Sequence, residues 1–214
     1  RALLDPYPYV FASVGVHPDQ PSDTVVTEAQ LLALAVDPRV IALGETGLDY
    51  YRQSGDLTWQ QERFRTHIRV ARSVNKPLII HTRAAAADTL RILREEGADT
   101  VGGVMHCFTE DWDTAVQALE LGFYLSFSGI VTFKSATALQ AVAARVPLDR
   151  LLVETDAPSL APVPLRGKVN QPAYVPYVGA YLAQLRQLPV AELAYHSSAN
   201  FWRGLGRCVA QELR

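Results

Sequence analysis

Four apolar stretches of this chain each lead to a side chain that can bind a metal ion. The stretches are residues 40–43, 78–80, 101–105 and 151–153. They lead, in chain order, to Glu45, His81, His106 and the run Glu154-Thr155-Asp156. Gly44 and Gly47 flank Glu45 and keep bulky side chains away from it. Buried strands that end at polar residues present those residues together at one edge of a sheet.

The residue types point to a divalent metal ion and to hydrolysis. Neutral imidazole and carboxylate suit Zn, Mn, Mg, Fe or Ni, and the set contains no thiolate of the kind that soft metals prefer. A metal-dependent hydrolase is therefore the first hypothesis. The alternative is that each residue is an ordinary polar residue at a strand end that faces a solvated loop. Four such residues on successive strands favour the metal site.

Strands and helices are predicted to alternate along the chain. Strands are predicted at residues 10–16, 40–45, 78–81, 101–107, 123–128 and 150–155, and helices at 27–36, 57–74, 86–96, 111–121, 135–146, 173–186, 190–195 and 198–212. Thr27 is predicted to cap the first helix, and Gly97 to end another in the left-handed conformation. Residues 157–172 contain four prolines and are predicted to form an irregular loop over the site. Apolar strands that each lead to a helix indicate a parallel sheet, and ligands at their carboxyl ends favour a (β/α) barrel.

Five short motifs carry a resemblance to a known family. They are Gly-Glu-Thr-Gly-Leu-Asp-Tyr-Tyr (44–51), Ile-His-Thr-Arg (80–83), His-Cys-Phe-Thr (106–109), Ser-Gly-Ile-Val-Thr-Phe (128–133) and Glu-Thr-Asp-Ala-Pro (154–158). Together they resemble the signatures of the TatD family of metal-dependent deoxyribonucleases. The resemblance implies an α/β TIM-type (β/α)8 barrel, of which six strands are predicted here. The family opens with a His-x-His pair of metal ligands, and no His precedes His17. We therefore expect about the first two βα units to be missing from this chain, and expect it to aggregate or bind a hydrophobic dye when expressed alone.

The resemblance also implies roles for the four predicted ligands. Glu45 is the carboxylate shared by two metal ions, and His81 and His106 fill one metal position. Asp156 completes the other position and holds the attacking water, so Asp156 and Glu45 are the expected catalytic residues. The complete protein is expected to hold two divalent ions (Mg, Mn or Zn), and this chain one or none. His17 could meet substrate, but a role behind the ligands or in a turn is as well supported.

Several residues near the predicted site could contact a nucleic acid. Arg83 lies two residues past His81 and could grip a phosphate, or form a loop salt bridge instead. The proline-rich loop offers a local basic group, Arg166 and Lys168 with Asn170. The aromatic residues that could stack on bases are Tyr50, Tyr51 and Phe108. Leu165 and Ala84 depart from the family pattern and leave the substrate class open.

The length, composition and net charge of the chain limit the classes of protein to which it can belong. With 214 residues, 49% of them hydrophobic and 20% charged, residues 1–214 are predicted to form a single partial barrel domain. A net charge of −2 provides no general attraction for nucleic acid, so any contact must be local. No stretch has the length of a membrane span or the pattern of a signal peptide, so a cytoplasmic location is expected.

The function predicted is hydrolysis of phosphodiester bonds at the 3' end of single-stranded DNA or RNA, by a metal-activated water. One alternative is an amide or ester hydrolase with the same metals, such as a D-aminoacyl-tRNA deacylase. Another is an inactive fragment that binds metal weakly, because the His-x-His pair is absent. Fold analogy alone does not decide among them.

Overall fold

The chain is built from parallel strands that are followed by helices. The structure is a computed structural model that describes residues 2–209. The described chain divides into two compact units. The first unit runs up to Val104 and resumes at Arg203, and the second is Met105–Trp202.

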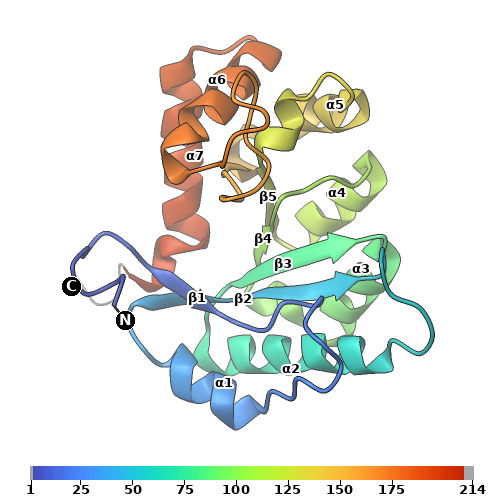
Figure 1. The fold of residues 1–214 in the computed structure, drawn as a ribbon. Coiled ribbons are helices and arrows are strands. Elements are labelled where there is room, and N and C mark those ends of the chain that lie inside the picture. The colour runs from blue at the N-terminus through green and yellow to red at the C-terminus, as the bar shows by residue number, and fades with distance from the viewer. Residues whose placement is uncertain (1, 210–214) are drawn as a thin grey trace. The chain divides into compact units, whose positions relative to one another are not determined.

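The first unit carries the longest strands. In chain order its elements are β1 (Ala12–Val14), α1 (Glu28–Ala35), β2 (Val40–Asp49), α2 (Thr58–Val74), β3 (Leu78–Arg83), α3 (Ala86–Glu95) and the start of β4 (Gly103–Met105). β1, β2 and β3 are parallel neighbours in that order. α1 and α2 lie together beneath these strands in Figure 1, so they cover one face of the sheet. This is the parallel α/β pattern that the sequence predicts.

The second unit continues the same alternation. Its elements are the end of β4, α4 (Trp112–Glu120), β5 (Phe123–Phe127), α5 (Thr137–Arg145), β6 (Leu151–Val153), α6 (Val175–Leu185) and most of α7 (Val190–Gly204). β5 and β6 are parallel, with Phe127 opposite Val153. The proline-rich segment between β6 and α6 contains only a short 3-10 turn, Pro172–Tyr174, and is otherwise the irregular loop that was predicted.

β2 is the central element of the first unit. Nine of its ten residues are buried, as expected for a parallel strand that is covered on both faces. Gly44 and Gly47 both have φ near +145°, and a Cβ at either would meet a backbone oxygen of β3, that of Ile79 or His81, at 2.5 Å or less. Glycine is required at these positions because the neighbouring strand approaches too closely for any side chain.

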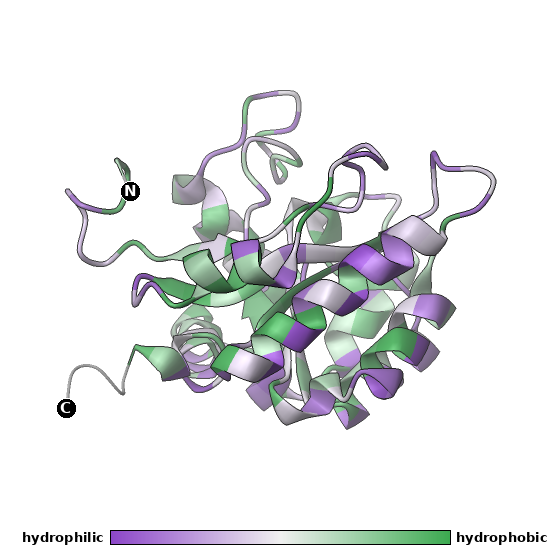
Figure 2. Ribbon diagram, turned by 90° about the horizontal axis from the view of Figure 1, so that it is seen from below, coloured by the Kyte–Doolittle hydropathy of each residue, from purple (hydrophilic) through white to green (hydrophobic). Residues whose placement is uncertain are grey.

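The structure confirms several predicted helix ends. Thr27 caps α1 in a capping box with Gln30, and Gly97 adopts φ +64° after α3. Several helices, α2, α3 and α4 among them, are amphipathic, and Figure 2 shows green and purple residues alternating along the helices. α2, for example, buries Phe64, Ile68 and Ala71.

Other predicted boundaries were wrong. β2 does not stop at Glu45 but continues to Asp49, and β3 continues past His81 to Arg83. β4 ends at Met105, so His106 follows the strand instead of lying in it. The two helices predicted at 190–195 and 198–212 are joined in one helix, α7, which ends at Gly204, because residues 196–203 contain no Pro or Gly to interrupt it. Residues 210–212 of that prediction lie outside the described residues. Among the described residues, none of the helices has the length and hydrophobicity that a membrane span requires.

Candidate metal centre

The register between β2 and β3 places His81 between two carboxylates. Gly47 of β2 is the partner of His81, so Glu45 and Asp49, two residues to either side, share the face of the sheet from which His81 projects. Nδ1 of His81 lies 2.9 Å from Oε1 of Glu45, and its Nε2 lies 2.9 Å from Oδ2 of Asp49. Both ring nitrogens of His81 therefore have an acidic partner.

His17, from the loop after β1, joins this group. Its Nε2 lies 3.2 Å from Nδ1 of His81 and 3.5 Å from Oε1 of Glu45, and its Nδ1 lies 2.5 Å from Oδ1 of Asp19. Burial of the ring works to lower the pKa of His17, but the hydrogen bonds and charges of Glu45 and Asp19 outweigh burial, so the pKa is raised. One ligand atom each from His17, Glu45 and His81 lies within 4.8 Å of the others. We call these three residues the first cluster.

The neighbouring carboxylates suggest which atoms of the first cluster face a ligand. We assign a proton to Nε2 of His81, which Asp49 accepts, and one to Nδ1 of His17, which Asp19 accepts. The remaining lone pairs, on Nδ1 of His81 and Nε2 of His17, then face Oε1 of Glu45. Three electron-rich atoms in such proximity repel one another unless a cation lies among them. Two imidazoles held by outer carboxylates and one inner carboxylate form a donor set that fits a divalent metal.

The second unit holds a similar group around His106. Nδ1 of His106 lies 2.5 Å from Oε2 of Glu154, and its Nε2 lies 3.2 Å from Oδ1 of Asp156. The other oxygen of Glu154 accepts the backbone N–H of Cys107 at 2.5 Å, which holds the carboxylate in place. One ligand atom each from His106, Glu154 and Asp156 lies within 4.8 Å of the others. We call these three residues the second cluster.

The structure thus brings the four predicted ligands together in pairs. Glu45 and His81 lie in the first cluster, and His106 and Asp156 lie in the second. The sequence did not show which residues orient His81 and His106. In the structure, Asp49 contacts His81 and Glu154 contacts His106. Sequence reasoning also gave His17 no place among the ligands. Asp49 could have been found from the sequence, since it follows Glu45 by four residues and shares its face in any strand that continues that far.

Arg83 and two tyrosines lie beside the first cluster. Arg83 follows His81 by two residues in β3 and shares its face, and its guanidinium lies 3.8 Å from the ring centre of Tyr51. Both side chains are exposed, and Tyr51 keeps 60% of its surface. The hydroxyl of Tyr50 is already engaged, since it donates to Asp88 and accepts from Gln61. Burial is the main reason why the pKa of Tyr50 is raised.

The predicted basic loop divides into exposed and buried residues. Arg166 stacks on Phe133 at 3.8 Å and is exposed, as is Lys168. Asn170 is only 2% exposed, and its side-chain amide donates to the carbonyls of Thr155 and Ser159. This geometry gives Asn170 a structural role on either side of Asp156, in place of the substrate contact that the sequence suggested.

Phe108 also differs from its expected role. It is buried, and its ring packs edge-on against Phe127 with 6.3 Å between ring centres. A base cannot stack on a ring that the core covers. Phe108 is therefore a packing residue.

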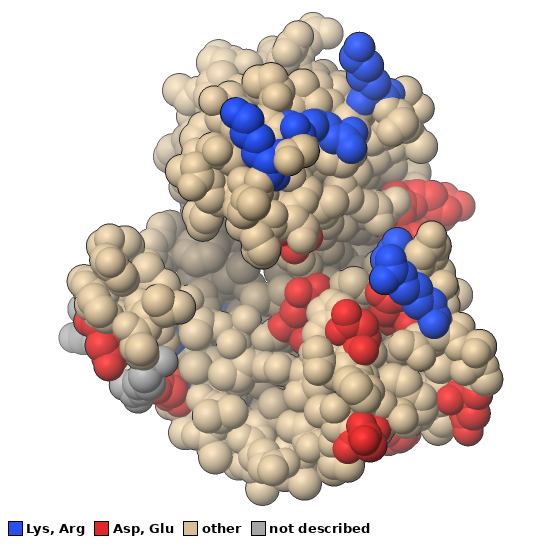
Figure 3. All heavy atoms as spheres, viewed as in Figure 1, with Lys and Arg blue, Asp and Glu red and all other residues tan. Residues whose placement is uncertain are grey.

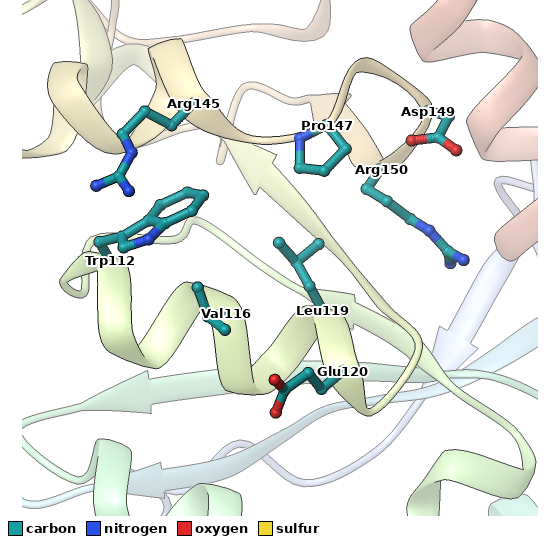
Figure 4. Close-up of a pocket in the computed structure, with 8 residues that line it drawn as sticks. All are labelled: Trp112, Val116, Leu119, Glu120, Arg145, Pro147, Asp149 and Arg150. Carbon is teal, nitrogen blue, oxygen red and sulfur yellow. The ribbon is translucent and has the colours of Figure 1, made fainter.

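A surface hollow in the second unit is separate in its residues from both clusters. It has a volume of about 540 Å³ between α4 and the segment that joins α5 to β6, and Val116, Leu119 and Pro147 give it an apolar floor (Figure 4). The guanidinium of Arg145 lies 3.9 Å from the ring centre of Trp112 at its edge. No predicted ligand lines this hollow.

Comparisons with known proteins show what the chain is similar to. Residues 1–206 match the family described as TatD related DNase. The chain is 55% identical over 203 residues to the uncharacterized metal-dependent hydrolase YcfH of Escherichia coli strain K12, over 95% of this chain and 76% of that protein. It is 33% identical over 206 residues to the 3'-5' ssDNA/RNA exonuclease TatD of Citrobacter rodentium, over 94% of this chain and 78% of that protein. The crystal structure of YJJV, a TatD homologue from Escherichia coli K12, is similar with a TM-score of 0.87 and 30% identity, over 96% of this chain and 80% of that one.

Proposed function

The chain belongs to the family of TatD-related DNases, and on that premise we propose that it cleaves phosphodiester bonds at the 3' end of single-stranded DNA or RNA. Family membership makes it a metal-dependent hydrolase with the α/β barrel fold of its relatives. The substrate is the proposed part. One observation supports metal-assisted hydrolysis most: each unit places a histidine beside a carboxylate and holds the far nitrogen of that histidine with a second carboxylate. The name of the Citrobacter relative supports the proposed substrate.

We assign the metal ligands by cluster. In the first cluster His17, Glu45 and His81 hold a divalent ion (Mg, Mn or Zn), with Asp19 and Asp49 orienting the two rings. In the second cluster His106 and Asp156 are ligands, and Glu154 orients His106. A divalent ion supplies a water of lowered pKa and draws charge from a phosphoryl oxygen.

The carboxylates of Glu45 and Asp156 complete the chemistry. Both are partly exposed, at 29% and 32% of their side-chain surface, so a substrate can reach them. Asp156 accepts the proton of the attacking water at Oδ1, which lies beside the Nε2 of His106. The carboxylate of Glu45 lies between the imidazoles of His17 and His81 and keeps them in place.

Exposed cations and rings beside the clusters suit a single strand. The stacked pair of Arg83 and Tyr51 offers a planar guanidinium for a phosphate and a ring face for a base. In the second unit Arg166 and Lys168 add positive charge, and Figure 3 shows Lys and Arg side chains gathered over the region of α5 and α6. These contacts are local, as the net charge of −2 requires.

An exonuclease assay tests the proposal. A single-stranded oligonucleotide labelled at its 3' end is incubated with the chain in Mn²⁺ or Mg²⁺, and release of the labelled nucleotide is followed. We expect Glu45→Gln to lower the rate by at least about 100-fold, because loss of a ligand should exceed the 10–100-fold effect of a residue that only orients one. Glu192→Gln, an exposed acid on α7, is the matched control and should keep the rate.

Other outcomes would redirect the proposal. An unchanged rate in Glu45→Gln contradicts it. Release of the amino acid from a charged tRNA, with no release of nucleotide, supports the amide or ester hydrolase instead. Failure to bind Mn²⁺ in calorimetry supports the inactive fragment.

A further inference from the structure

One of the five family motifs, residues 128–133, contains no candidate ligand and no candidate substrate contact. It follows β5 and consists mainly of a 3-10 turn, Gly129–Thr132. The side chains of Ser128 and Thr132 are buried, at 2% and 6% exposure. Because buried polar groups need hydrogen-bond partners, the partners of these two residues indicate what the motif holds in place.

The start of the motif contacts the residue that follows His106. The hydroxyl of Ser128 lies 3.1 Å from the sulfur of Cys107, and it also accepts the N–H of Ile130, which caps the turn. The backbone N–H of Cys107 donates to Glu154, the carboxylate that orients His106. The motif is therefore in contact with the segment that carries His106.

The rest of the motif holds the loop that begins at Asp156. A Cβ on Gly129 would meet the carbonyl oxygen of Leu160 at 2.0 Å, so only glycine allows the loop to approach this closely. The hydroxyl of Thr132 accepts the backbone N–H of Val163 at 2.9 Å and donates to the carbonyl of Gly129 at 2.7 Å. One side chain thus bonds both to the loop and to its own turn.

The chain between these contacts and Asp156 has little freedom. Pro158 and Pro162 each fix one backbone angle. The carbonyl of Asp156 accepts the N–H of the residue three positions later at 3.0 Å, which closes a turn. Asp156 and Leu160 have φ of +57° and +58°, a region that residues other than glycine occupy only where the surrounding structure holds them. Loss of the contacts with the motif is therefore expected to displace Asp156.

Asn170 and Thr132 hold this loop in different ways. The amide of Asn170 donates to the carbonyls of Thr155 and Ser159 and so closes the loop on itself. Thr132 joins the loop to the turn after β5, which is a separate element of the same unit. A bond of the second kind sets where the loop lies within the unit.

The hydroxyl of Thr132 is the central contact of this arrangement. We propose that Thr132 is a positioning residue that acts through the backbone of Val163 and keeps Asp156 beside His106 for metal binding. Oδ1 of Asp156 lies 3.2 Å from Nε2 of His106 in this arrangement. The inference rests on the proposed role of Asp156 as a metal ligand.

A purely structural role for Thr132 makes a different prediction. A buried threonine that only stabilises the fold would lower the unfolding midpoint on substitution and leave the metal affinity of the folded chain unchanged. A residue that acts through Asp156 lowers that affinity, but only while Asp156 can bind the metal. The effects of the two substitutions are then not additive, and a double-mutant cycle with Asp156→Asn measures the difference.

Calorimetric titration of the full chain with Mn²⁺ tests the proposal. Thr132→Val keeps the shape of the side chain and removes both hydrogen bonds, whereas Thr132→Ser keeps the hydroxyl. Both variants are measured alone, and Thr132→Val is also measured in the Asp156→Asn background. Thr114→Val is the matched control, because it removes a hydroxyl of similar burial, 7% exposed, from α4 of the same unit.

We expect Thr132→Val to weaken Mn²⁺ binding about tenfold, the lower end of the effect of residues that orient a ligand. In the Asp156→Asn background the same substitution should change the affinity by less than about twofold. Thr132→Ser and Thr114→Val should match the parent. Amide hydrogen exchange of residues 157–165, followed by mass spectrometry, should be faster in Thr132→Val because the N–H of Val163 has lost its acceptor.

Four results overturn the positioning role and leave the metal site intact. The first is equal Mn²⁺ affinity in Thr132→Val and the parent, and the second is equal hydrogen exchange in these two proteins. The third is an equal loss of affinity in Thr132→Val and Thr114→Val, because the loss is then general. The fourth is a full tenfold loss from Thr132→Val in the Asp156→Asn background.

The remaining results are also decisive. If the parent itself binds no Mn²⁺, the proposed metal site fails and the inference fails with it, before any variant is compared. If Asp156→Asn binds too weakly to be measured, Thr132→Ser decides, and a tenfold loss with the hydroxyl still present overturns the role.

Circular dichroism shows whether the variants are folded. If Thr132→Val is unfolded, Thr132→Ala replaces it, since the smaller side chain leaves space for a water that can bond to the carbonyl of Gly129. Loss of the fold in both variants overturns the positioning role in favour of a structural one.

Discussion

At the scale of single residues, the main feature is that each candidate ligand histidine has a carboxylate on its far nitrogen. Asp49 holds His81 and Glu154 holds His106. Such outer partners fix the tautomer and the orientation of the ring, and they make the facing nitrogen a better donor. Each of these candidate ligand histidines is therefore paired with a carboxylate that orients its ring.

Replacement of one outer carboxylate should weaken metal binding without removing a ligand. In Asp49→Asn the amide can still meet Nε2 of His81 but carries no charge, so the ring loses its electrostatic partner. We expect Mn²⁺ affinity to fall about 10–100-fold, measured by calorimetry.

Asp99→Asn, an exposed acid of the same unit, is the control for the change in net charge. Equal losses in the two variants would show that the effect comes from overall charge and not from the orientation of His81.

At the scale of elements, α2 contributes a buried histidine whose charge state affects stability. Burial is the main cause that lowers the pKa of His67 to about 4, and the nearby charge of Arg63 adds to the effect, while the hydrogen bond to the Arg63 carbonyl opposes it. His67 therefore binds a proton near pH 6.5 in the unfolded chain, but only near pH 4 in the folded chain. The contribution of His67 to stability is complete above pH 6.5 and is lost as the pH falls toward 4.

This difference predicts a steeper loss of stability in acid for the parent than for His67→Gln. A shift of one pKa unit corresponds to about 1.4 kcal/mol, so the parent should lose about 3 kcal/mol more than the variant between pH 6.5 and 4. Urea unfolding at several pH values measures it, and the comparison at pH 8 gives the cost of the substitution itself. Parallel curves for the two proteins would contradict the prediction.

The loop after β6 depends on one buried amide. Asn170 donates to the carbonyls of Thr155 and Ser159, and its Oδ1 accepts the N–H of Gln171. Asn170→Ala leaves these groups without their partner, at a cost of about 1–3 kcal/mol for each buried group. We expect a lower unfolding midpoint and weaker metal binding at the second cluster, because Asp156 lies inside the loop.

Gln171→Ala removes an exposed neighbouring side chain and is the matched control. A loss of stability in Asn170→Ala with unchanged metal affinity would separate the fold of the loop from the placement of Asp156.

At the scale of the whole molecule, each of the two units holds one cluster within its own residues. A metal that binds the folded chain and not the unfolded chain stabilises the folded state by mass action. At a free Mn²⁺ concentration of about 100 times the dissociation constant, the gain is about 2.7 kcal/mol. For a chain of this size that corresponds to a rise of about 5–10 °C in the unfolding midpoint.

Differential scanning fluorimetry with Mn²⁺, and then with excess chelator, measures this rise and its reversal. The double variant Glu45→Gln/His106→Ala should show no rise. A rise of equal size in the double variant would mean that Mn²⁺ binds elsewhere on the chain.

The sequence by itself determined the alternation of strands and helices and the family of the chain. It also determined that His81, His106 and Asp156 lie at or near strand ends, because hydrophobic periodicity and glycine positions are local properties, whereas Glu45 lies in the middle of β2. Local patterns place a residue along its own strand to within a few positions, which is why the lengths of β2 and β4 were wrong.

Only the tertiary structure decided which atoms meet. The pairing of Gly47 with His81 places that ring between Glu45 and Asp49, and a shift of one residue would turn it to the other face. The contact of His17 with Glu45 depends on a loop that α2 fastens through Gln60, Arg63 and His67. Register and loop placement arise from packing between segments far apart in the chain, and no local pattern of residues encodes them.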